Sequence, residues 1–182
     1  AAIDAAAANG PGLDLVFIAG NQTYSGQALS ITGHDVWLAG GYPDCSASQQ
    51  TPQQQATLDG AGNGGNPVIR VDNSGPRRGN IILQDLELAG GQLANGEGGG
   101  LRVEGNLHIN LSGVRLRANS ALRGGGLYVK GQSDTEPASM VILDSSATGN
   151  ASLIQDNQAI EGGGLYADES SSIQVASLVE NN

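Results

Sequence analysis

Four acidic residues in the first half of the chain have side chains that could support acid–base chemistry: Asp59, Asp72, Asp85 and Glu87. Cleavage of a polysaccharide needs clustered carboxylates, or a calcium site with an Arg or Lys base nearby. The four acids lie on different expected strands and have no obvious partner in the sequence. We therefore predict that they are solvated on the outside of the fold, and we assign no catalytic residues.

Residues that could bind a metal ion are sparse. His34 and His108 are isolated, and neither has a second ligand at a useful spacing. The segment DGAGNGGN at 59–66 has one carboxylate, whereas calcium loops have several. We interpret this segment as a flexible turn, and the sequence predicts no metal site and no cofactor.

The single cysteine, Cys45, has no nearby His that could act as its base. It allows no disulfide within this sequence. Three interpretations stay open: an unpaired loop thiol, a disulfide with a cysteine outside this sequence and, with the least support, a catalytic thiol.

A candidate binding surface comes from three residues at equivalent positions after glycine runs: Arg102, Tyr128 and Tyr166. They alternate with apolar neighbours, so they should point outward and stack as an aromatic and Arg strip that suits sugars or proteins. A second row two residues further on contains Glu104, Lys130 and Asp168. Both rows could instead only stabilise a sheet, at about 0.2–1 kcal/mol per cross-strand pair. We expect Tyr128→Ala to cost far less stability than Leu127→Ala.

Internal repeats show which elements position these residues. The run GGGL begins at Gly98, Gly124 and Gly162. A second pattern recurs with an offset of 28 residues, so that NIILQDLELAGG at 80–91 aligns with LHINLSGVRLRAN at 107–119. The polar segment GQSDTEPAS at 131–139 lengthens one interval and is typical of an inserted loop. Such self-similarity at a fixed period is characteristic of repeat architectures.

Apolar and polar residues alternate within each repeat, which indicates short strands. One repeat cannot bury its own apolar face. If each repeat forms one turn of a coil, equivalent residues stack at about 4.8 Å, and Leu lies on Leu. The sequence therefore predicts an all-β fold, a parallel β-helix, whose narrow core needs aliphatic residues and few aromatic ones.

The glycines have a structural explanation in this fold. They fall where one strand must bend into the next, and Gly can take a positive φ or let neighbouring turns approach closely. Asn119 and Asn157 should stack at a corner and hydrogen bond to each other. A phosphate-binding loop is the alternative, but no Lys-Ser/Thr and no helix follow the glycine runs.

The N-terminal segment differs from the repeats. AAIDAAAANG at 1–10 is predicted to form a short helix that caps the open end of the coil. We expect a single domain over 1–182, with the helical cap at 1–10, irregular first coils at 13–97 and regular GGGL repeats at 98–182. The last repeat stops without a glycine run, so we expect further coils or a cap after Asn182.

Charge and hydropathy limit the kinds of partner and environment that the sequence allows. Acidic residues outnumber basic ones 18 to 8, and this negative charge disfavours nucleic acid. No stretch of about 20 apolar residues is present, so no transmembrane segment is predicted.

The motifs GGGLY, GGGLR, LRAN, IQDN and LVEN resemble the paired motifs of polymorphic outer-membrane proteins, with Leu or Ile where that family prefers Phe. The stretch from 26 to 45 is also similar to secreted bacterial proteins of the pectate-lyase-like superfamily. The resemblance implies a right-handed coil and an extracellular or cell-surface setting. It implies no particular activity, because that fold includes lyases, hydrolases and adhesive stalks.

These observations predict a structural and adhesive segment of a secreted or surface-displayed bacterial protein. Its expected partners are carbohydrate or a host or cell-surface protein. The alternative is a polysaccharide lyase or glycoside hydrolase. An acidic cluster with a basic partner on one lateral face would favour the enzyme.

Overall fold

The computed structural model describes residues 8, 12–44, 46–132, 139–168 and 170–182. These residues form β-strands and no helix. The strands are joined by short turns, as the alternating apolar pattern predicts. All strand pairs are parallel, and the strands form three large sheets and one small one.

Sheet A contains β1 (Leu13–Ala19), β4 (Asp35–Tyr42), β7 (Gly79–Gln84), β10 (Leu107–Ser112), β14 (Ser139–Asp144) and β18 (Ser171–Val175). Sheet B contains β2 (Thr23–Tyr24), β5 (Ala56–Asp59), β8 (Leu86–Ala89), β11 (Arg115–Arg117), β15 (Leu153–Gln155) and β19 (Leu178–Glu180). Sheet C contains β3 (Leu29–Thr32), β6 (Ile69–Asn73), β9 (Leu101–Gly105), β13 (Leu127–Lys130) and β17 (Leu165–Ala167). Sheet D contains β12 (Ser120–Arg123) and β16 (Gln158–Glu161).

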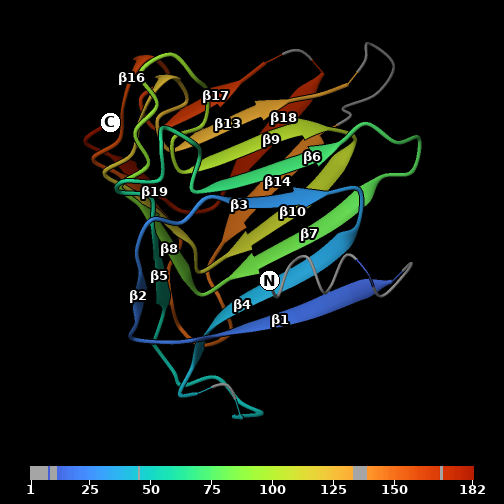
Figure 1. The fold of residues 1–182 in the computed structure, drawn as a ribbon, viewed down its shortest axis with the longest axis vertical. Coiled ribbons are helices and arrows are strands. Elements are labelled where there is room, and N and C mark those ends of the chain that lie inside the picture. The colour runs from blue at the N-terminus through green and yellow to red at the C-terminus, as the bar shows by residue number, and fades with distance from the viewer. Residues whose placement is uncertain (1–7, 9–11, 45, 133–138, 169) are drawn as a thin grey trace.

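The chain passes through the sheets in a cyclic order. It runs from sheet A to sheet B to sheet C and back to sheet A, and the later passes insert a strand of sheet D between B and C. Figure 1 shows the result, with β1 near one end of the stack and β17 near the other. This all-β arrangement of stacked parallel sheets is consistent with the predicted parallel β-helix.

The register of the strands confirms the offset of 28 residues. Ile109 pairs with Ile81 and Leu111 with Leu83 in sheet A, and Leu116 pairs with Leu88 in sheet B. The inward side chains of the three sheets form one buried core, which consists of aliphatic residues. Stacking like on like therefore buries the faces that a single repeat would expose.

Glycines occupy the corners that lead into sheet C. Gly124 has a φ of 57°, in the left-handed region where a side chain is strained. Gly126 does not have a left-handed φ, but a side chain there has no space, because a Cβ would lie 2.7 Å from the carbonyl oxygen of Gly164 on the next coil. Both predicted reasons for the repeated glycines, a sharp bend and a close approach, are thus confirmed.

A ladder of asparagines holds the corner that follows sheet B. Asn119 Nδ2 donates to Asn157 Oδ1 at 3.1 Å, and Asn157 Nδ2 donates to Asn182 Oδ1 at 2.9 Å. Each amide also caps the backbone: Asn157 Nδ2 donates to the carbonyl of Leu116. Asn119 and Asn157 are buried, so these bonds satisfy groups that water cannot reach. The predicted stacking of Asn119 on Asn157 is confirmed.

Several predictions fall on residues outside the described part of the chain. The helix expected at 1–10 lies outside it except for Ala8, Cys45 lies outside it, and so do residues 133–138 of the inserted loop.

Candidate functional site

The outer face of sheet C carries the predicted binding residues. In the strand register Tyr128 pairs with Arg102 on one side and with Tyr166 on the other. Arg70 pairs with Arg102 on the preceding coil and extends the column. The structure therefore brings Arg102, Tyr128 and Tyr166 together as expected and adds Arg70, which sequence reasoning missed. The signal was available, because IRVD at 69–72 repeats the pattern of LRVE at 101–104.

Tyr128 differs from the expectation of an outward surface residue. Its inward neighbours Leu127 and Val129 are fully buried, so its side chain does leave the core, yet only 2% of it is exposed. Its ring stacks on Tyr166 with 5.7 Å between centroids and 7° between planes. The reason is lateral packing: alternation predicts the side of a sheet but not what covers that side.

The hydroxyl of Tyr128 is held within the fold. It donates a hydrogen bond to Asp168 Oδ2 at 2.9 Å. Burial, then this hydrogen bond and the nearby negative charge, raise the pKa of Tyr128 above its usual value. Tyr128 is thus a neutral hydrogen-bond donor whose hydroxyl proton is directed at Asp168.

The charged residues of this face pair within the fold. Arg102 Nη2 donates to Glu104 Oε1 at 2.7 Å and lies 3.7 Å from Glu97. Arg70 pairs with Asp72 in the same way, and the hydrogen bond to Asp72 raises the pKa of Arg70. The Arg102–Glu104 and Arg70–Asp72 pairs form within one strand, between residues two apart.

The second row differs in part from its prediction. Lys130 pairs with Glu104 in the strand register, as expected. The carboxylate of Asp168 accepts the hydrogen bond from Tyr128, so it serves the aromatic column as well as its own row. Arg123 adds a cation above the column, 5.7 Å from the centroid of the Tyr166 ring. It also lies 3.4 Å from Glu161 on the adjacent strand of sheet D.

Asp85 contradicts the prediction that the four acids are solvated and without partners. Its side chain is completely buried. The carboxylate accepts hydrogen bonds from Asn150 Nδ2 at 2.7 Å and Gln50 Nε2 at 2.9 Å. Thr148 Oγ1 and Gln84 Nε2 complete the shell at 2.9 and 3.2 Å. Gln50, Thr148 and Asn150 come from two long connections that follow sheet A, whereas Gln84 is the last residue of β7. Asp85 therefore ties both connections to one corner of the coil.

The other three acids also have partners. Asp59 accepts a hydrogen bond from the amide of Ala61 at 2.8 Å, which is a local turn contact. Asp72 pairs with Arg70 on sheet C, and Glu87 pairs with Arg117 on sheet B. The structure therefore spreads these acids over two faces and one buried corner.

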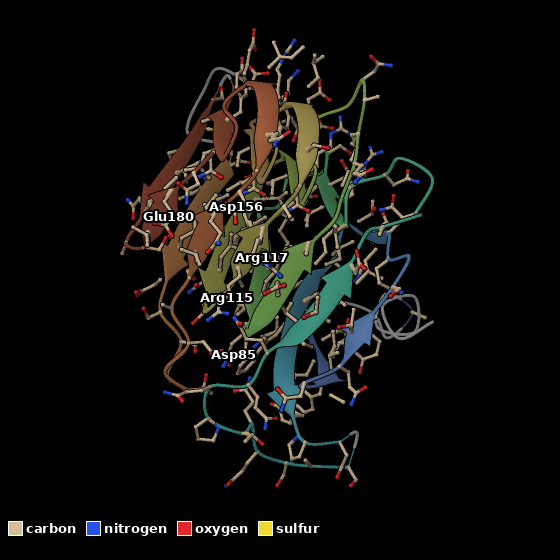
Figure 2. The ribbon with its side chains drawn as sticks, turned by 90° about the vertical axis from the view of Figure 1, so that its left-hand side faces the viewer. Asp85, Arg115, Arg117, Asp156 and Glu180 are labelled. Atoms are coloured by element: carbon tan, nitrogen blue, oxygen red, sulfur yellow. The ribbon has the colours of Figure 1, made fainter. Side chains whose placement is uncertain are left out.

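The outer face of sheet B carries a mixed cluster in which Glu87, one of the four candidate acids, lies beside two arginines that were not predicted as site residues. Arg117 Nη2 donates to Glu87 Oε1 at 2.9 Å, and this hydrogen bond raises the pKa of Arg117. Arg115 lies opposite Glu87 in the strand register. Figure 2 shows Arg115, Arg117, Asp156 and Glu180 on this side of the molecule. The signal was the sequence RLR at 115–117, whose arginines alternate with a buried leucine.

Metal-binding groups do not gather within the described residues. No group of three or more His, Cys, Asp or Glu side chains there could hold a metal ion. His34 contacts the carbonyl of Thr32 through Nδ1 at 2.9 Å, and His108 lies on the outer face of sheet A. No described helix could cross a bilayer.

Comparison with known proteins identifies no relative: no protein-family model, curated protein or solved structure matches this chain.

Proposed function

We propose that this chain is a right-handed parallel β-helix that serves a structural and adhesive role in a secreted or cell-surface bacterial protein. Its lateral faces present a rigid surface to carbohydrate or to a host or cell-surface protein. The resemblance of the GGGL and LRAN motifs to those of polymorphic outer-membrane proteins supports the secreted or cell-surface setting. The general preference of parallel crossovers for a right-handed path supports the handedness. A helix over 1–10 would cap the first coil.

The observation that carries this proposal is the column on sheet C. Its arginines and tyrosines stack from coil to coil in register, and each is fixed by a neighbour within the fold. Fixed side chains lose little conformational entropy when a partner binds. Arg70 remains about half exposed, and Tyr166 is partly exposed. These two residues, and not Tyr128, are the contacts that we assign to a ligand.

Equilibrium binding to immobilised neutral polysaccharides, acidic polysaccharides and surface glycoproteins tests the proposal. Arg70→Ala and Tyr166→Ala should each weaken the binding that the unaltered chain shows. Arg117→Ala is the matched control, because its side chain is exposed to the same extent, 47%, on a different face. Equal losses from Arg70→Ala and Arg117→Ala would contradict a site on sheet C.

The second candidate is a polysaccharide-cleaving enzyme, and the cluster on sheet B is the observation that favours it. Glu87 is largely buried beside two arginines on one lateral face. An acid with a basic partner on one face is the arrangement that a polysaccharide-cleaving enzyme would need. The Nε atom of Arg115 is inaccessible and has no hydrogen-bond partner among the described residues. Turnover of a polysaccharide that Glu87→Gln or Arg115→Ala abolishes would support the enzyme.

A further inference from the structure

The outer face of sheet A is apolar at its N-terminal end. Three outward side chains of β1 are about half exposed: Leu13 at 48%, Leu15 at 54% and Phe17 at 44%. Leu15 pairs with Trp37 on β4, and Trp37 pairs with Ile82 on β7. The only Trp and the only Phe of the chain thus lie on adjacent strands of one face.

Aromatic contacts give this surface a fixed shape. The ring of Phe17 stacks on Tyr42 with 4.4 Å between centroids. Trp37 Nε1 donates to Gln84 Oε1 at 3.2 Å, which holds the indole in one orientation. Large aromatic side chains held in place are typical of the centres of protein interfaces.

The same face is nearly free of charge. Among the described strands of sheet A, the outward positions hold two carboxylates, Asp35 and Asp144. Asp35 is buried and pairs with Arg77, which neutralises it. The faces of sheets B and C carry most of the outward charged residues, in a chain whose formal net charge is −10. Two copies would meet with least repulsion through sheet A.

We propose that the outer face of sheet A binds a second copy of this chain, so that two sheets pack face to face about a twofold axis. Six strands at about 4.8 Å and about six residues per strand give a face of roughly 24 by 20 Å. Two such faces approach the lower limit of about 1,000 Å² for a specific interface. An interface of this size lies at the low end of specific interfaces, so the dimer should be weak and should form only at high protein concentration. This inference is independent of the proposed adhesive function.

Sedimentation equilibrium of the 182-residue chain over a range from low micromolar to several hundred micromolar tests the dimer. The unaltered chain should shift from 18.4 kDa to twice that mass. Leu15→Glu, which places a charge on the face of each copy, should leave only monomer. Leu178→Glu is the control, because Leu178 is 55% exposed on the terminal strand of sheet B. It should dimerise as the unaltered chain does.

Circular dichroism should show the same strand content in all three proteins. A chain that stays monomeric throughout the range would overturn the proposal, and so would a mass that grows beyond the dimer. Equal weakening by Leu15→Glu and Leu178→Glu would also overturn it, because the contact would then not lie on sheet A.

Discussion

Replacing Tyr128 by alanine should destabilise the fold as much as a core substitution does. The side chain is 98% buried, with a ring stacked on Tyr166 and a hydroxyl bonded to Asp168. Truncation of a buried aromatic residue costs about 3–5 kcal/mol. Leu127→Ala, on the inward side of the same strand, should cost about 2–5 kcal/mol. The two losses should therefore be similar, in contrast to the sequence-based expectation.

Two further variants separate the contributions of Tyr128. Tyr128→Phe keeps the ring and removes one hydrogen bond to a carboxylate, and it should cost about 1.5–3 kcal/mol. Tyr166→Ala removes the stacking from a partly exposed residue and should cost less than Tyr128→Ala. Urea denaturation at neutral pH, followed by circular dichroism, measures the free energies of unfolding of the unaltered chain and of the four variants. A loss below about 1 kcal/mol for Tyr128→Ala would refute the buried position.

The pH dependence gives an independent check on Tyr128. Its pKa in the folded chain lies above the unfolded value of about 10, because burial and Asp168 disfavour the phenolate. Its contribution is therefore complete below about pH 10 and is lost as the pH rises through the folded value. The unaltered chain should lose more stability above pH 10 than Tyr128→Phe does. Equal alkaline losses would contradict this environment.

Three shorter predictions concern the corners and the charge row, each read from urea denaturation. Asn157→Ala removes the partners of the Leu116 carbonyl and of the backbone N–H of Asn119, and each unsatisfied group should cost about 1–3 kcal/mol. The control Asn110→Ala removes an exposed side chain and should be nearly neutral. Gly126→Ala places a Cβ 2.7 Å from the Gly164 oxygen and should cost more than Gly26→Ala, which meets no atom within 4 Å and pays only for its positive φ. Lys130→Glu faces Glu104 and should cost about 1 kcal/mol at low salt, and much of this should return at high salt. A cost that salt does not change would show that Lys130 does not act through charge.

Repetition explains why the strand register could be predicted from sequence. Each coil repeats the local requirements of its neighbours, so aligned motifs place Leu127 on Leu101 and Asn119 on Asn157. The alternation also assigns inward and outward sides correctly. These parts of the fold depend on residues that are close together in each repeat, and local sequence contains that information.

Contacts between distant segments could not be predicted in this way. Asp85 is buried because Gln50 and Asn150, which lie in two irregular connections, reach it from different coils. Nothing in the local pattern links these residues. The prediction that Tyr128 is exposed was wrong for the same reason, since its burial depends on side chains of the adjacent coils. The missing member of the column, Arg70, lacks the preceding glycine run that marked the other three.

Disulfide cross-linking tests the stacking of successive coils most directly. In a Cys45→Ser background, Glu104→Cys with Lys130→Cys places two thiols on paired positions of β9 and β13. Adjacent strands lie about 4.8 Å apart, within disulfide reach. Asp72→Cys with Lys130→Cys is the control, because these positions are two coils apart, at about 9.6 Å. Mass spectrometry after mild oxidation should show the first disulfide and not the second. Formation of the second without the first would contradict the stacked coil.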